Sequence, residues 1–167
     1  MEKRALSMAL LLAAGMAGGT GMNDVGTDNV AMALAVDAGE GRVRVTVQLE
    51  NKGARPVYVP RAIAAATQLD GRVFDVRDAR TGQEVPYQGR MVKRGPLTAD
   101  DFVVLAPHAT HRHTIDITPA YGFQPGTHDY HLSYGGNYGA DVQALAGGAP
   151  SGRLTAPAVR FSFTARP

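Results

Sequence analysis

A chain of 167 residues is long enough for one domain of ordinary size, and the absence of cysteine excludes disulfide bonds as a source of its stability. Its 17 basic and 15 acidic residues leave a formal charge of only +2. A nucleic-acid-binding surface needs clustered basic side chains, so this balance argues against that class of function.

The first residues, 1–19, predict a cleavable signal peptide. Residues 2–4 are charged, residues 5–17 form an apolar run of about 13 residues, and small residues follow at 18–20. That run is too short to span a bilayer as a helix, which needs about 20 apolar residues. The chain also has no cysteine for a lipoprotein anchor. We therefore expect a secreted or periplasmic protein with no membrane span after cleavage.

The remainder predicts a short flexible N-terminus, residues 20–28, and a single domain, residues 29–167. Apolar and polar residues alternate most clearly from Val43 to Leu49, which is the pattern of a half-buried strand. Similar segments recur between turn residues. The segments predicted as strands are Val30–Val36, Val43–Leu49, Pro56–Val59, Val73–Val76, Glu84–Gln88, Phe102–Leu105, His111–Ile117, His128–Tyr134 and Val159–Phe163.

Two segments do not follow the strand pattern. Residues 63–67 suit either one helical turn or a loop that crosses between sheets. Residues 135–152 are rich in Gly and Ala and predict a long loop, with one weak helical turn near Val142 to Leu145. Seven to nine short strands without an amphipathic helix indicate an all-β fold, an immunoglobulin-like antiparallel β-sandwich.

The segment Pro86–His108 is the least ordinary part of the sequence. A basic turn, Lys93–Pro96, is followed by two adjacent aspartates and a short apolar run. Aromatic and arginine side chains are enriched where proteins bind one another. The residues predicted to contact a protein partner are Tyr87, Arg90, Lys93, Arg94, Pro96, Asp100 and Asp101. The alternative is a solvated connection that serves only the fold, and for the two aspartates we favour a capping or turn role.

The five histidines raise a metal hypothesis. His111 and His113 lie on one face of a predicted strand, where such a pair can share an ion. The candidates for a third ligand are His108, His128 and His131. The alternative, which we favour, is that His111 and His113 are partly buried and hydrogen-bonded. We therefore expect no metal and no cofactor.

No catalytic centre is predicted. None of Ser133, Ser151 and Ser162 lies in a G-x-S-x-G nucleophile elbow. Asp100 and Asp101 have no evident base or carboxylate partner at catalytic spacing. The sequence therefore favours a binding protein over an enzyme.

Several motifs in combination resemble one known module. They are LENKGARPVYV at 49–59, VFDVRD at 73–78, VPYxGRxVKRGPxTADDFVVLAP at 85–107, TIDIT at 114–118 and GTxxY at 126–130. This combination resembles the N-terminal β-sandwich region of bacterial deuterolysin-type (aspzincin) metalloendopeptidases, including peptidyl-Lys-specific ones. The resemblance covers about Val30 to Tyr134, and its most specific segment is Val85–Pro107.

The departure from that family is as informative as the match. In those proteases the sandwich precedes a helical catalytic domain that binds zinc through HExxH, and this chain contains no HExxH. The resemblance therefore implies a non-enzymatic counterpart that binds a metalloendopeptidase as inhibitor, chaperone or accessory. The alternatives are an envelope adhesion module for glycan or protein ligands, a His-based periplasmic metal binder, and a fragment of a split protease.

Lys93 leads to a sharper hypothesis. Only Lys52 and Lys93 remain as lysines after signal cleavage. The resemblance implies enzymes that can prefer Lys-containing sites. The loop around Lys93 would then occupy the cleft of a related protease in the manner of a substrate.

Overall fold

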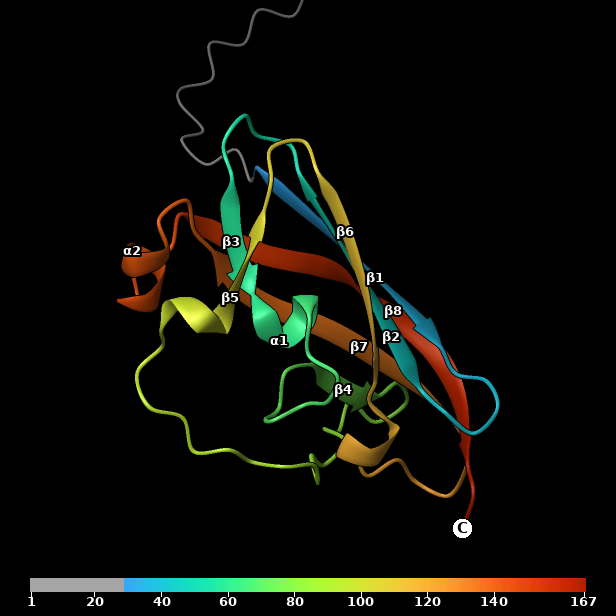
Figure 1. Cartoon of the computed structure of the whole chain (residues 1–167). Helices are drawn as coiled ribbons and strands as arrows, with labels where there is room; N and C mark the ends of the chain where they lie inside the picture. The colour runs from blue at the N-terminus through green and yellow to red at the C-terminus, as the bar shows by residue number, and fades with distance from the viewer. Residues whose placement is uncertain (1–28) are drawn as a thin grey trace, which may run out of the picture.

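The computed structural model describes residues 29–167 (Figure 1). The predicted signal peptide, residues 1–19, and the predicted flexible N-terminus, residues 20–28, lie outside this part of the chain. Among the described residues, no helix is both long and apolar enough to cross a membrane.

Eight strands and four short helical segments form the fold of residues 29–167, within the predicted range of seven to nine strands. The strands are β1 (Val30–Asp37), β2 (Arg44–Asn51), β3 (Val57–Pro60), β4 (Asp75–Asp78), β5 (Phe102–Leu105), β6 (Thr110–Asp116), β7 (Gly126–Tyr138) and β8 (Gly152–Ala165). The α-helices are α1 (Arg61–Ala64) and α2 (Val142–Ala146), and the 3-10 helices are η1 (Ala99–Asp101) and η2 (Thr118–Ala120).

The strands pair in three antiparallel sheets, β1-β2-β6, β4-β7-β8 and β3-β5. The small β3-β5 sheet continues from the end of β7, because Tyr58 and Gly139 exchange two backbone hydrogen bonds of 2.7 and 3.1 Å. Figure 1 shows the long strands β7 and β8 across from β2 and β6. The predicted all-β sandwich is confirmed, and the finer immunoglobulin-like assignment stays a prediction.

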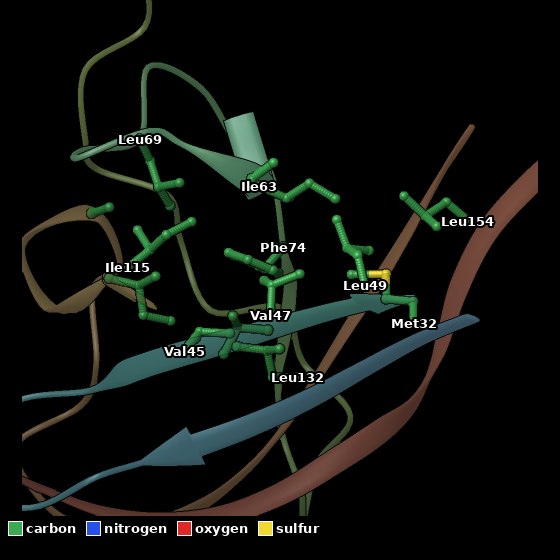
Figure 2. Packing of buried hydrophobic residues seen from close by; sticks show 14 of the residues in the cluster. Met32, Val45, Val47, Leu49, Ile63, Leu69, Phe74, Ile115, Leu132 and Leu154 are labelled. Atoms are coloured by element: carbon green, nitrogen blue, oxygen red, sulfur yellow. The ribbon is translucent and has the colours of Figure 1, made fainter. Parts of the chain in front are cut away.

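Alternation along β2 decides which side of its sheet faces the core. Val45, Val47 and Leu49 are fully buried, whereas the residues between them are partly exposed. Figure 2 shows these side chains gathered with Phe74 and with Leu132 of β7. Burying one such aliphatic side chain contributes about 1.5–3 kcal/mol. Apolar burial of this kind takes the place of disulfide bonds in a chain without cysteine.

The strand predicted at 73–76 begins later than expected. β4 starts at Asp75, and the preceding residue, Phe74, has no strand partner. Its backbone N–H donates to the Tyr121 hydroxyl at 3.1 Å, and the same hydroxyl donates to the Phe74 carbonyl at 2.6 Å. A side chain that is distant in sequence therefore satisfies both backbone groups, which no local pattern reveals.

The strand predicted at 84–88 is wrong as a continuous element. The segment forms two isolated bridges, Arg77–Glu84 and Tyr87–Tyr121. The segment pairs with β4 at Glu84 and with the corner after η2 only three residues later, at Tyr87. It therefore does not pair with either neighbour over enough residues to form a strand.

The predicted loop at 135–152 is wrong at its two ends. β7 continues to Tyr138 and β8 already begins at Gly152, so the connection is shorter than expected. The weak helical turn predicted near Val142 to Leu145 is confirmed as α2, with Asp141 accepting a hydrogen bond from the Ala144 N–H at 2.8 Å. The Gly-rich end of β7 hides its strand character, because glycines carry no side chains that could alternate.

The buried Tyr121 and the partly buried Tyr134 make stability depend on alkaline pH. Burial raises the pKa of Tyr121 and of Tyr134 to about 12. In the unfolded chain these phenols ionise from about pH 10, so their contribution to stability is complete below that pH and is lost as the pH rises to about 12. We expect the free energy of unfolding to fall by roughly 2 kcal/mol per tyrosine across this range. Urea unfolding at about pH 9 and about pH 11.5 measures the loss, and equal midpoints would contradict it.

Candidate binding loop

The loop at residues 86–101 connects β4 to β5 and is fixed where it leaves the sheet. The N–H of Gln88 donates to the Ala120 carbonyl at 2.8 Å, and the Pro86 carbonyl accepts from the Gly122 N–H at 2.8 Å. Both bonds reach across from the corner after η2. The first turn of the loop is therefore held by a part of the chain that lies more than thirty residues away in sequence.

Tyr87 points inward and supports this turn. Its half-buried ring packs edge-to-face on Tyr121, with ring centroids 5.4 Å apart and planes at 81°. The Tyr87 hydroxyl lies 2.7 Å from the Arg90 carbonyl oxygen and 3.2 Å from that of Leu69. Burial raises the pKa of the Tyr87 hydroxyl. The neutral phenol thus ties the start of the loop to the segment before β4.

Gly89 is required by this close packing. A Cβ atom at Gly89 would lie 2.7 Å from the Tyr87 hydroxyl oxygen and 3.0 Å from the Cβ atom of Ala120. We expect Gly89→Ala to destabilise the protein by about 1–3 kcal/mol, because the Tyr87 ring is wedged against Tyr121 and cannot yield freely. Gly95→Ala in the same loop is the control, since its Cβ would meet nothing within 4 Å. Equal urea midpoints for the two variants would contradict this account.

A capping box closes the other end of the loop. The Thr98 N–H donates to the Asp101 carboxylate at 2.8 Å, as in a capping box, and the Asp101 N–H closes the 3-10 turn by donating to the Thr98 carbonyl at 3.1 Å. Arg94 forms an ion pair with the same carboxylate at 3.2 Å. The capping role, which we favoured from the sequence for both aspartates, is therefore the observed role of Asp101.

Arg61 supports this end from the side of α1. Its Nε donates to the Asp100 carbonyl at 2.7 Å, and its Nη2 donates to the Phe102 carbonyl at 3.3 Å. These bonds fix η1 against the start of β5. Sequence reasoning missed Arg61, because nothing in the chain near residue 61 indicates a contact with residues 100–102.

Between the two anchored ends, every residue from 91 to 100 is exposed. Three of them are large hydrophobic residues: Met91 is 76% exposed, Leu97 47% and Val92 42%. Lys93 is exposed and forms no ion pair within residues 29–167. Figure 1 shows this yellow-green segment running clear of the sheets before it reaches η1. Apolar side chains gathered on an exposed segment are typical of surfaces that bind a partner.

A cleft of about 390 Å³ lies behind the loop. Arg94 and Asp101 line its outer side, and α1 with the residues up to 73 lines its inner side. One carboxylate oxygen of Asp70, Oδ1, is enclosed here without a hydrogen-bond donor among the described residues; the nearest cation is Arg90 Nε at 3.8 Å. The loop also contacts the wall of this cleft, because the Val92 N–H donates to the Asp70 carbonyl at 3.2 Å.

The seven residues predicted to contact a partner thus fall into two groups. Three of them mainly hold the loop in place: Tyr87, Arg90 and Asp101. Four are exposed, namely Lys93, Arg94, Pro96 and Asp100, and of these Arg94 also pairs with Asp101 and lines the cleft. The second group and the apolar residues beside it form the accessible part of the predicted contact surface.

The two candidate metal ligands on β6 bond to the protein itself. Nε2 of His111 lies 2.6 Å from the Ala64 carbonyl oxygen, and Nε2 of His113 lies 2.7 Å from that of Ala66. Since carbonyl oxygens accept, both rings carry a proton on Nε2. Within residues 29–167 no group of three or more acidic, His or Cys side chains is arranged to hold a metal ion. The ambiguous segment at 63–67 is the end of α1 and the loop after it, fastened to β6 by these rings.

No protein-family model matches the chain, and no curated protein sequence is significantly similar to it.

Proposed function

We propose that this protein is a non-catalytic binding module of the periplasm or the secreted fraction, and that its loop at 86–101 contacts a protein partner. The partner class we propose is a deuterolysin-type metalloendopeptidase, bound by the module as inhibitor, chaperone or accessory. The choice of partner rests on the resemblance of Val85–Pro107 to the N-terminal module of those enzymes, in an immunoglobulin-like sandwich that serves as scaffold.

The observation that carries the proposal is a loop with fixed ends and an exposed middle. Hydrogen bonds hold both ends, whereas residues 91–100 are exposed and include Met91, Val92 and Leu97. A segment that is held in this way loses little conformational entropy when it binds. Apolar and basic side chains on such a segment supply the contacts that dominate protein–protein affinity.

The test uses the two lysines of the domain. A deuterolysin-type peptidyl-Lys metalloendopeptidase is titrated with the protein, and both complex formation and residual peptidase activity are measured. If Lys93 occupies the cleft of the protease, Lys93→Ala should weaken binding at least about thirtyfold, which corresponds to a hot-spot loss of about 2 kcal/mol. Lys52→Ala, an exposed lysine in the turn after β2, should bind like the unchanged protein.

The same titration separates the loop from its lysine. Equal affinities of the Lys93→Ala and Lys52→Ala variants would contradict the hypothesis that Lys93 occupies the protease cleft as a substrate would. Binding that also survives the triple replacement of Met91, Val92 and Leu97 by serine would place the contact elsewhere on the module.

A further inference from the structure

Within residues 29–167, the outer edge of β6 has no strand beside it. Two hydrogen bonds at the ends of β6 show which of its residues direct their backbone groups toward β2. The Asn51 N–H donates to the Ala109 carbonyl at 3.0 Å, and the Ile117 N–H donates to the Val43 carbonyl at 2.9 Å. Hydrogen-bonded residues alternate along an antiparallel pair, so the odd-numbered residues of β6 bond β2. The residues whose N–H and C=O groups point away from β2 are Thr110, Arg112, Thr114 and Asp116.

The strands β4, β1 and β8 at the sides of the sandwich are covered differently. Residues 83–85 form backbone hydrogen bonds with β4. The Asp78 N–H donates to the Gln83 carbonyl and the Val85 N–H donates to the Val76 carbonyl, each at 2.8 Å. β1 and β8 lie beside each other and close that side (Figure 1). In the described part of the chain, the outward backbone groups of β6 have no backbone partner. β6 also has no proline, no lysine and no shift of register against β2, which are features that natural proteins use on edge strands to prevent pairing.

The inward side of β6 is already filled. His111 and His113 direct their rings to the carbonyls of Ala64 and Ala66, so an added strand would displace nothing from the core. On the outward side Thr110, Arg112 and Thr114 are exposed. The free edge is therefore accessible and rigidly supported.

We propose that β6 pairs antiparallel with β6 of a second copy of this chain, about a two-fold axis at Thr114. In this register Arg112 of each copy lies opposite Asp116 of the other. An axis at Arg112 would set two guanidinium groups against each other, and an axis at His113 would set Arg112 opposite Thr114. Opposite charges directly across a sheet stabilise it and like charges destabilise it, so charge selects the axis at Thr114.

Both charged groups are available for the new pairs. Arg112 bonds only the exposed Gln48 amide, at 2.8 Å, among the described residues. Oδ1 of Asp116 accepts from the N–H and the hydroxyl of Thr118, whereas Oδ2 has only Arg42 at 3.8 Å. The interface is thus built from backbone hydrogen bonds and two symmetric ion pairs, and it is independent of the proposed function.

A single-cysteine variant tests the register directly, because the chain contains no cysteine. Directly opposed residues of a hydrogen-bonded antiparallel pair have Cα atoms about 5.5 Å apart, within the range of about 4.4–6.8 Å that disulfides span. Thr114→Cys should form a disulfide-linked dimer under mild oxidation at least about tenfold faster than Thr164→Cys. Thr164 is a matched control, since each threonine is exposed and bonds one cross-strand threonine hydroxyl, at 2.9 Å for Thr114 and 2.8 Å for Thr164. Equal rates overturn the proposal.

Sedimentation equilibrium of the cysteine-free protein provides a second measurement. We expect a concentration-dependent dimer whose dissociation constant rises about tenfold in Arg112→Asp, because two attractive pairs become two repulsive ones. Arg153→Asp, at an exposed arginine of β8, should leave the constant unchanged. A protein that stays monomeric up to millimolar concentration, or a dimer that is insensitive to Arg112→Asp, overturns the proposal.

Discussion

Tyr121→Phe is expected to lower the free energy of unfolding by about 3 kcal/mol, because two buried backbone groups lose their partner at once. The Tyr121 hydroxyl accepts from the Phe74 N–H at 3.1 Å and donates to the Phe74 carbonyl at 2.6 Å. Tyr121 itself is 1% exposed, so water cannot replace the lost hydroxyl without opening the core. The substitution removes one oxygen atom and leaves the ring packing unchanged.

Urea unfolding of Tyr121→Phe and Tyr58→Phe measures this effect. Tyr58 is half-buried, and its hydroxyl forms no hydrogen bond within residues 29–167, so its loss should change stability by less than about 0.5 kcal/mol. The Tyr121→Phe variant should also lose one of the two alkaline stability changes described above. Similar midpoints for the two variants would show that the Phe74 backbone finds other partners.

Asn51→Ala is expected to cost a similar amount, about 3 kcal/mol, for the same physical reason. Asn51 is fully buried, and its amide NH2 group faces three carbonyl oxygens: Arg55 at 2.8 Å, Leu105 at 3.1 Å and Ala106 at 3.1 Å. Its side-chain oxygen accepts from the Gly53 N–H at 3.0 Å. Alanine leaves these groups without partners and opens a cavity beside them.

The control for Asn51 is Asn137→Ala, at an exposed position of β7 that should change stability by less than about 0.5 kcal/mol. Thermal or urea unfolding of both variants at neutral pH makes the comparison. A loss below about 1 kcal/mol for Asn51→Ala would mean that water enters and satisfies the carbonyls.

These two buried polar side chains also bear on the candidate loop. Tyr121 supports Tyr87 at the start of the loop, and Asn51 holds the carbonyls of Leu105 and Ala106 at the far end of β5, the strand that follows the loop. The start of the loop therefore depends on the core directly, and its end only through β5. Hydrogen exchange should show faster opening of residues 87–90 in Tyr121→Phe than in Asn51→Ala, since only the first variant weakens that end.

Strand alternation predicted the architecture well where side chains carry the signal. Val45, Val47 and Leu49 are buried as their spacing requires, and the all-β sandwich follows from the repetition of such segments. The prediction failed where the backbone is satisfied from a distance, as at Phe74, and where glycine conceals the alternation, as at the end of β7. The conspicuous composition of Pro86–His108 indicated an unusual loop, but Arg61 could not be assigned to it from its own neighbourhood.

The sequence by itself determined that this protein folds as a β-sandwich without disulfides, and it indicated which segment departs from the regular pattern. Both follow from local chemistry, namely the two-residue period of strands and the enrichment of Gly, Pro and charge in one connection. Only the tertiary structure decided which loop residues are anchors and which are exposed, and that the outer edge of β6 is open. Those properties depend on hydrogen bonds between residues far apart in the chain, such as Tyr121 to Phe74 and Asn51 to Leu105, and on which strand lacks a neighbour.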